Sequence, residues 1–330
     1  MPRIASSFAV IDSHTAGHPT RVILSGVPRL LGATVRARRD DFRDRFDHLR
    51  PLLLHEPRGH AAMVGLVPVP SAEADHGAFF ISSYTYLDMC GHGTIGYAKT
   101  LAASGQISPA AGDSFTLETP AGVVTVGLVW SNDGELASVR LRNVPSYLAI
   151  EDLRVDVAGL GAVSADIGYG GMWYALVDAR PLGLSLGPDN VGELLRLGSA
   201  IKSEVRKALG GNALIGGDPA PSVLFYLDHG SNESTHLLVL DINKFDRSPC
   251  GTGTAARLAQ LARKDRLGGD GIYRARNIFG IPFAARVVGR THVGGFAAVV
   301  AEIEGSAHIT AHSTIVLEAG DPIAEGFLCR

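Results

Sequence analysis

The amino-acid sequence predicts an α/β protein of two domains, and three observations support this. The chain has 330 residues, which is long for one hydrophobic core and suits two domains. Its apolar segments mostly resemble short strands bounded by glycine or proline, and fewer stretches show helical spacing. Two similar motifs, DMCGHGTIG at 88–96 and SPCGTGTAA at 248–256, each stand between a predicted strand and a predicted helix. We therefore expect one strand–cysteine–helix unit in each half of the chain.

The first half of the chain is predicted to be rich in strands. Helical spacing of three and four residues predicts a helix over 40–54, interrupted by Pro51. A second helix follows the first motif at 94–105, where a glycine ends it. Strands are expected at 8–14, 21–26, 77–89 and 137–149, together with a hairpin at 114–130 that turns at Pro120-Ala121-Gly122.

The second half shows the same pattern of short strands and fewer helices. A long helix is expected at 190–211, ending at two glycines, and another follows the second motif at 252–265. Strands are expected at 175–179, 222–228, 235–242 and 296–305. We place the first domain at 1–135, with roughly the last 20 residues returning to it, and the second domain at 136–310.

The composition excludes several classes of function. Hydrophobic residues make up 46% and charged residues 19%, with a net charge of −3, so neither nucleic acid nor an anionic membrane is an expected partner. No apolar run reaches the ~18–20 residues of a membrane span, and the N-terminus does not resemble a signal peptide. Three cysteines are too few for a disulfide framework, so we expect reduced thiols in the cytoplasm.

Each motif joins a thiol to the start of a helix. Cys90 and Cys250 lie 160 positions apart, close to half the chain. The first N–H groups of a helix have no helical partners and carry partial positive charge, so they are expected to lower a thiol pKa and to bind a carboxylate. Two such thiols on either side of an α-carbon are suited to removing a proton from one face and returning one to the other.

Other readings of these residues stay open at this point. The two cysteines are alternatively small buried residues under helix starts, or zinc ligands together with His92, although the tight spacing of zinc ligands is missing. The His92 imidazole and Asp246 have structural alternatives, in local hydrogen bonding and in a turn before Pro249. None of the five lysines stands in an evident pyridoxal motif, and no dinucleotide or nucleotide-phosphate loop is present.

Segments along the whole chain resemble the proline racemase family. This family includes proline racemases, 4-hydroxyproline 2-epimerases and trans-3-hydroxy-L-proline dehydratases. The resemblance is carried by MCGHGTIG (89–96) and DRSPCGTGT (246–254), with DSHTAG (12–17), EPRGH (56–60), DIGYGG (166–171), a GSAHIT turn (305–310) and DPIAEGF (321–327).

The resemblance implies a fold, a chemistry and a set of site residues. The fold is that of diaminopimelate epimerase: two pseudo-symmetric α/β domains, each with strands around a central helix, and the active site in the cleft between them. The enzyme is an isomerase that needs no cofactor and no metal, and it acts on an imino acid, often as a homodimer. The implied acid–base pair is Cys90 and Cys250, the backbone N–H groups that bind the substrate carboxylate are those of Gly91, His92, Gly251 and Thr252, and Asp246 contacts the ring nitrogen.

Single positions distinguish the subgroups of this family. Dehydratases usually carry threonine at the second catalytic position, so Cys250 favours racemisation or epimerisation. Hydroxyproline epimerases typically carry histidine 28 positions earlier, where this chain has Ser222, so proline is the preferred substrate. The alternatives are a 4-hydroxyproline 2-epimerase, a trans-3-hydroxy-L-proline dehydratase and a non-catalytic imino-acid-binding protein. His18 and Met172 also depart from the usual residues of the family.

Overall fold

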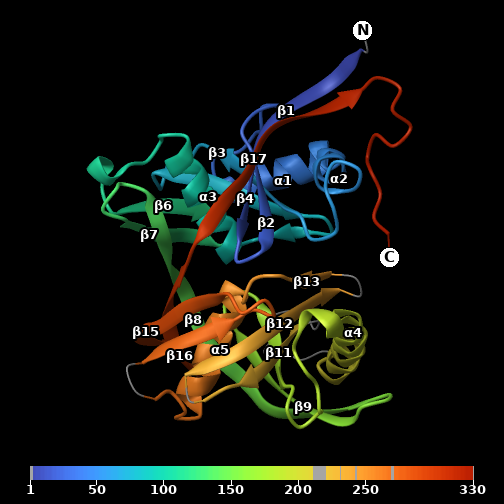
Figure 1. Ribbon diagram of the computed structural model, residues 1–330, viewed down its shortest axis with the longest axis vertical. Coiled ribbons are helices and arrows are strands. Elements are labelled where there is room, and N and C mark those ends of the chain that lie inside the picture. Colours follow the sequence, from blue (N-terminus) through green and yellow to red (C-terminus); the bar gives the residue numbers. More distant parts are fainter. Residues whose placement is uncertain (1–2, 211–220, 231, 242–243, 269–270, 330) are drawn as a thin grey trace. The chain divides into compact units, whose positions relative to one another are not determined.

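The structure is a computed structural model that describes residues 3–210, 221–230, 232–241, 244–268 and 271–329 (Figure 1). The chain divides into two compact units. Unit 1 is Met1–Leu141 with Gly305–Arg330, and unit 2 is Arg142–Glu304. The domain boundaries expected from the sequence, 1–135 and 136–310, stay a prediction. Among the described residues, no helix is both long and apolar enough to span a membrane.

Unit 1 consists mainly of strands, and its described residues contain three helices. The helices are α1 (Val35–Phe46), α2 (Leu49–Leu54) and α3 (Gly91–Ala103), and there is a 3-10 turn, η1 (Pro109–Ala111). The strands are β1 (Ile4–Thr15), β2 (His18–Ile23), β3 (Val64–Val69), β4 (His76–Ser82), β5 (Tyr86–Leu87), β6 (Ser114–Thr119), β7 (Gly122–Trp130), β17 (Ala307–Glu318) and the first residues of β8 (Leu136–Val157).

Unit 2 also consists mainly of strands. Its described helices are α4 (Val191–Ala208) and α5 (Gly251–Arg263), and η2 (Pro188–Asn190) is a 3-10 turn. After the remainder of β8, the strands are β9 (Gly161–Tyr169), β10 (Trp173–Asp178), β11 (Ser222–Asp228), β12 (Glu233–Asp241), β13 (Lys244–Asp246), β14 (Ile272–Arg276), β15 (Pro282–Val293) and β16 (Phe296–Gly305).

The two units share one order of strands. Unit 1 follows β17-β1-β2-β3-β4-β6-β7-β8, and unit 2 follows β8-β9-β10-β11-β12-β14-β15-β16. In each series only the third and fifth pairings are parallel, namely β2–β3 and β4–β6 in unit 1 and β10–β11 and β12–β14 in unit 2. The short β5 and β13 pair antiparallel with β4 and β12. The predicted pseudo-symmetric α/β fold is therefore confirmed.

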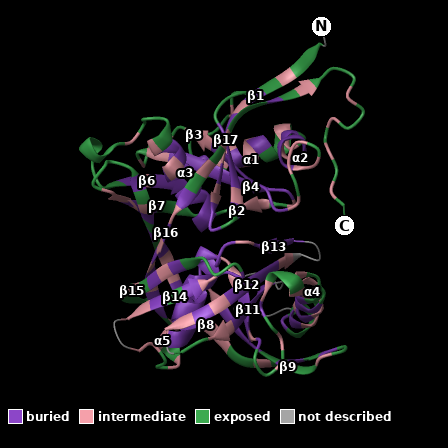
Figure 2. Ribbon diagram, viewed as in Figure 1, coloured by how far each residue is buried: buried purple, intermediate pink, exposed green. Residues whose placement is uncertain are grey.

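A buried helix stands at the centre of each unit (Figure 2). In α3 ten of thirteen residues are buried, and in α5 eleven of thirteen, so neither helix has a solvated face. The α3 helix contacts β1, β2, β3 and β17, whereas α5 contacts β9, β10 and β15. Small residues permit this close packing: a Cβ atom on Gly96 would lie 2.9 Å from the Ser13 hydroxyl. The predicted strands around a central helix are thus present in both units.

The covering helix α4 packs on the core of unit 2. Its buried residues recur every three or four positions, which produces one apolar stripe. They are Leu194, Leu197, Gly198, Ile201 and Val205. The helix was expected over 190–211, and it ends at Ala208; residue 211 lies outside the described residues.

The helix expected over 40–54 is two helices, and the break is not at the proline. The first helix, α1, ends at Phe46, and α2 begins at Leu49. Pro51 is the third residue of α2, a first-turn position whose N–H has no helical acceptor, so the proline ring costs no hydrogen bond there. A further correction concerns the expected turn at 305–310, because Ala307–Ile309 open β17 and pair with β1, and Thr310 lies at a bulge of the same strand.

Candidate active site

Both predicted catalytic cysteines lie at the N-terminus of a central helix. Cys90 is the N-cap residue of α3 and Cys250 is the N-cap residue of α5. Both carry thiols and are almost fully buried, with 5% and 4% of their surface exposed. Each unit therefore presents one thiol at the positive end of a helix dipole.

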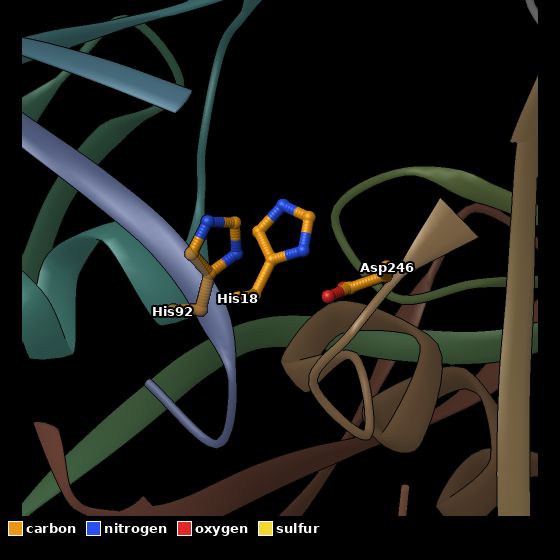
Figure 3. A group of neighbouring side chains, drawn as sticks. All are labelled: His18, His92 and Asp246. Carbon is orange, nitrogen blue, oxygen red and sulfur yellow. The ribbon is translucent and has the colours of Figure 1, made fainter. Parts of the chain in front are cut away.

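In unit 1 the thiol contacts one histidine, which packs against a second. The Cys90 sulfur lies 3.4 Å from Nδ1 of His92. The His92 ring packs edge-on against His18, with ring centroids 4.3 Å apart, and Figure 3 draws these two rings next to each other. Thr15 donates a hydrogen bond of 3.0 Å to the His92 carbonyl and so fixes the start of the helix. The structure brings Cys90, the adjacent Gly91 and His92 together.

In unit 2 the thiol is surrounded by hydrogen-bond donors. The Cys250 sulfur accepts a hydrogen bond of 3.2 Å from the N–H of Gly253. The hydroxyl groups of Tyr174 and Thr252 lie 3.6 Å and 3.7 Å from the sulfur, and 2.5 Å from each other. These groups favour a negative charge on the sulfur. The structure brings Cys250, the adjacent Gly251 and Thr252 together.

The two half-sites match in detail. His92 and Thr252 each stand two residues after their cysteine, and each side chain touches the sulfur. A Cβ atom on Gly93 would lie 3.1 Å from the Cys90 sulfur, and one on Gly253 would lie 3.0 Å from the Cys250 sulfur. The glycine that follows each cysteine by three positions therefore leaves the space that the sulfur occupies. The resemblance of the two motifs extends to the placement of their atoms.

The half-sites differ by one residue in the loop before the cysteine. The β5 strand ends at Leu87, three residues before Cys90, whereas β13 ends at Asp246, four residues before Cys250. Cys90 has an extended backbone with φ −147°, but Cys250 has φ 65° and ψ 104°. The additional residue is accommodated by this left-handed backbone. Such a conformation costs a non-glycine residue on the order of 1–3 kcal/mol.

Asp246 is the last residue of β13, immediately before that loop (Figure 3), and its side chain is buried. Its carboxylate accepts a hydrogen bond of 2.8 Å from the N–H of Ser248, and the Ser248 hydroxyl accepts one of 3.1 Å from the N–H of Cys250. The turn role that the sequence left open is thus present. Burial raises the pKa of Asp246 to about 6. The ionised form has lost hydration on burial, so this carboxylate is suited to pairing with a positively charged ligand.

Burial also overturns the expected acidity of the second thiol. A helix N-terminus lowers a thiol pKa, yet the pKa of Cys250 is raised to about 12. The first cause is loss of hydration, and the charge of Asp246 adds to it. Hydrogen bonds from Tyr174, Gly253 and Thr252 oppose the rise without cancelling it. At neutral pH Cys250 therefore keeps its proton.

The buried Asp246 carboxyl is expected to make stability depend on pH. Its folded pKa of about 6 lies above its ordinary 3.8, so its contribution to stability is fully present below pH 3.8 and is lost as the pH rises through 6. Relative to Asp246→Asn, the wild-type free energy of unfolding should fall by ~3 kcal/mol between pH 4 and pH 7. Urea denaturation of both proteins at the two pH values measures this. A constant difference would contradict it.

Several contacts of the half-sites were not predicted from the sequence. Tyr174 of β10 touches both Cys250 and Thr252. It lies two residues after Met172, which departs from the usual residues of the family. Tyr174 pairs with the first residue of β11, and Thr20 of β2 pairs with the first residue of the equivalent strand β3, so Tyr174 and Thr20 are equivalent. Two residues earlier in each unit, Met172 and His18 therefore also occupy equivalent positions. The two departures noted in the sequence therefore concern one position of the repeated unit. Aligning the halves on their cysteines alone does not reveal this, because the loops differ in length.

Comparisons with known proteins agree over the whole chain. A protein-family model described as proline racemase matches residues 10–328. A curated 4-hydroxyproline 2-epimerase from Shewanella loihica is 36% identical over 98% of this chain and 99% of its own, and a proline racemase from Acetoanaerobium sticklandii is 34% identical over 98% and 99%. A hydroxyproline epimerase from Agrobacterium vitis, solved with bound trans-4-hydroxy-L-proline, has a TM-score of 0.86 and 28% identity, covering 99% of this chain and 97% of the other.

Proposed function

Since this chain belongs to the proline racemase family, we propose that it inverts C2 of proline or a hydroxyproline, with proline as the first substrate. The membership confirms the resemblance seen in the sequence and the prediction of an isomerase of this family. The observation that carries the proposal is the pair of equivalent buried thiols, each at the start of a central helix. Cytoplasmic location and a homodimer stay predictions.

In the proposed reaction the two thiols exchange protons with the substrate. A thiolate takes the α-proton, which leaves a carbanion next to the carboxylate, and the other cysteine gives its S–H proton to the opposite face of that carbon. The product is the mirror-image centre at C2, and the two sulfurs have exchanged protonation states. The reverse reaction uses the same groups in the opposite roles. The proposal requires no cofactor and no metal.

The surroundings of Cys250 support its role as the proton donor in the resting protein. Burial raises its pKa to about 12, so it begins as a thiol. After the proton has left, donors from Tyr174, Thr252 and Gly253 are in place to stabilise the thiolate. We therefore propose that Cys90 is the base for the enantiomer turned over from the resting state, and that the reverse reaction starts from Cys250 as thiolate.

The remaining predicted residues are proposed to bind the substrate. The first N–H groups of a helix bind anions, and these come from Gly91 and His92 in α3 and from Gly251 and Thr252 in α5. The substrate nitrogen is a cation, and Asp246 is the buried acid that precedes Cys250. Its pKa of about 6 means that it is mainly a carboxylate at neutral pH and able to pair with that cation.

Ser222 is the residue on which the choice of proline depends. It is 9% exposed, begins β11 and pairs in register with Tyr174, which contacts the Cys250 sulfur. By the family resemblance, a histidine at this position is typical of 4-hydroxyproline epimerases, and serine is shorter and less basic. The second candidate substrate is nevertheless 4-hydroxyproline. Relatives named 4-hydroxyproline 2-epimerase are as similar to this chain as those named proline racemase.

Proton NMR in D2O with three separate compounds tests the proposed function. L-Proline is expected to lose its α-proton signal, chiral chromatography of the same sample should show D-proline accumulating, and trans-4-hydroxy-L-proline should react more slowly. Epimerisation of the 4-hydroxy compound alone would make the chain a 4-hydroxyproline 2-epimerase. Loss of water from trans-3-hydroxy-L-proline would make it a dehydratase. Exchange with none of them, together with thermal stabilisation by one, would reduce it to a binding protein.

A further inference from the structure

Three buried polar side chains in unit 2 form a chain that leads to the loop before Cys250. Ser234, His236 and Tyr273 are each no more than 1% exposed. The Tyr273 hydroxyl is hydrogen-bonded to the Ser234 hydroxyl and lies 2.8 Å from Nε2 of His236. The other ring nitrogen, Nδ1, lies 3.1 Å from the carbonyl oxygen of Pro249, the residue before Cys250.

The partners fix the direction of these hydrogen bonds. A carbonyl oxygen only accepts, so Nδ1 of His236 carries the hydrogen and donates to Pro249. In the neutral ring Nε2 is then an acceptor, so Tyr273 donates to it and accepts from Ser234. Burial lowers the pKa of His236 to about 4, so the ring stays neutral at working pH and keeps this tautomer.

Unit 1 lacks an equivalent of this chain in its matched strands. Tyr226 pairs with His236 in β11–β12, and Pro68 pairs with Ala78 at the equivalent place in β3–β4. By the same correspondence Phe115 of β6 takes the position of Tyr273 in β14. Alanine and phenylalanine have no side-chain donor to offer. The half with the polar chain is also the half with the longer loop and the left-handed cysteine.

We propose that His236 is a positioning residue for Cys250. By donating to the Pro249 carbonyl, it holds the longer loop in the form that keeps the Cys250 sulfur on the Gly253 N–H. Thr254 gives the same carbonyl a second, longer hydrogen bond of 3.3 Å. Tyr273 and Ser234 secure the tautomer that the contact requires. The catalytic part of this proposal rests on the proposed function, whereas the placement of the sulfur does not.

Two substitutions at His236 separate positioning from general packing. His236→Leu removes the donor, and His236→Asn keeps an N–H close to the place of Nδ1. With L-proline, His236→Leu should lower kcat about 10- to 100-fold with KM changed less than about twofold, since misplacement by about 1 Å has effects of this size. His236→Asn should recover most of the lost kcat. His76→Leu, in β4 of unit 1, is the control and should retain wild-type kcat.

Alkylation of the thiols reads out the sulfur position without relying on activity. Iodoacetamide labelling followed by mass spectrometry gives the rate at Cys250 relative to that at Cys90. In His236→Leu this ratio should rise about threefold or more, because a released loop exposes the sulfur. The ratio should stay near wild type in His236→Asn and His76→Leu.

The outcomes distinguish the possible failures. An unchanged alkylation ratio and a kcat within twofold of wild type in His236→Leu would overturn the positioning role. A kcat in His236→Asn that is no higher than in His236→Leu would overturn it as well. If His236→Leu does not fold, Tyr273→Phe is the substitute variant, because it keeps the aromatic ring of residue 273 and removes the hydroxyl that donates to Nε2 of His236. It must then show both the lower kcat and the higher alkylation ratio. A wild-type protein that exchanges no α-proton would refute the proposed function, while the alkylation ratio would still decide the positioning role.

Discussion

Replacing either Cys90 or Cys250 with alanine is expected to lower the rate of proline inversion by about 10³-fold or more. In the proposed reaction each sulfur either takes or gives a proton in every turnover, and a positioned acid or base contributes roughly 10²- to 10⁴-fold. Alanine leaves the helix starts and their N–H groups in place, so substrate binding should weaken far less than turnover. Chiral chromatography of the product measures the rate.

The remaining thiol in each variant allows a second readout. It should still remove and return a proton on its own face, so each variant is expected to exchange the α-proton of one enantiomer only, and the two variants should select opposite enantiomers. Cys329→Ala, at an exposed cysteine, is the matched control and should retain full activity. Inversion at more than a tenth of the wild-type rate in Cys90→Ala or Cys250→Ala would refute the two-thiol account.

Gly170→Ala is expected to have a large effect on both stability and activity. This residue lies in the turn between β9 and β10, and a Cβ atom there would stand 2.0 Å from the Thr252 carbonyl oxygen and 2.8 Å from the Ala256 nitrogen. Both are backbone atoms of the central helix α5, so relief requires the helix to move. We expect a loss of about 3 kcal/mol or more in the free energy of unfolding. Displacement of Thr252 should also lower kcat/KM.

Gly168→Ala, in the strand β9 that leads into this turn, provides the matched control. Its nearest neighbours would lie at 3.5 Å, an ordinary contact distance, and its backbone φ is one that alanine adopts. The free energy of unfolding should change by less than about 1 kcal/mol. Urea denaturation and kinetics with L-proline compare the two variants. Similar behaviour of both would contradict the close approach of the turn to α5.

The parts of the fold with local signals were predictable from the sequence. A cysteine followed by glycines and a helical pattern located the starts of α3 and α5, and these also carry the candidate site. The ranges 222–228 and 296–305 agree with the observed β11 and β16. In these strands the apolar residues are continuous or alternate regularly, because the strands pack on the core.

Features that depend on pairing between distant segments were not predictable. Most residues of β17 are exposed or partly exposed, and the strand is placed by its pairing with β1, about 300 residues away in the chain. The contacts of Tyr174 and His236 with the second half-site depend on strand register. The raised pKa of Cys250 depends on burial, which outweighs the helix dipole that the sequence does indicate.

The central claim is that two different thiols act on opposite faces of the α-carbon. The most direct test is the location of deuterium after a brief reaction of L-proline in D2O, stopped before a tenth of the substrate has reacted. The two enantiomers are separated by chiral chromatography, and mass spectrometry measures the deuterium in each. The account predicts that D-proline carries deuterium at C2, from the donating thiol, while the remaining L-proline keeps its original proton. D-Proline that retains the substrate's own proton would contradict the claim, because one group would then have carried that proton between faces.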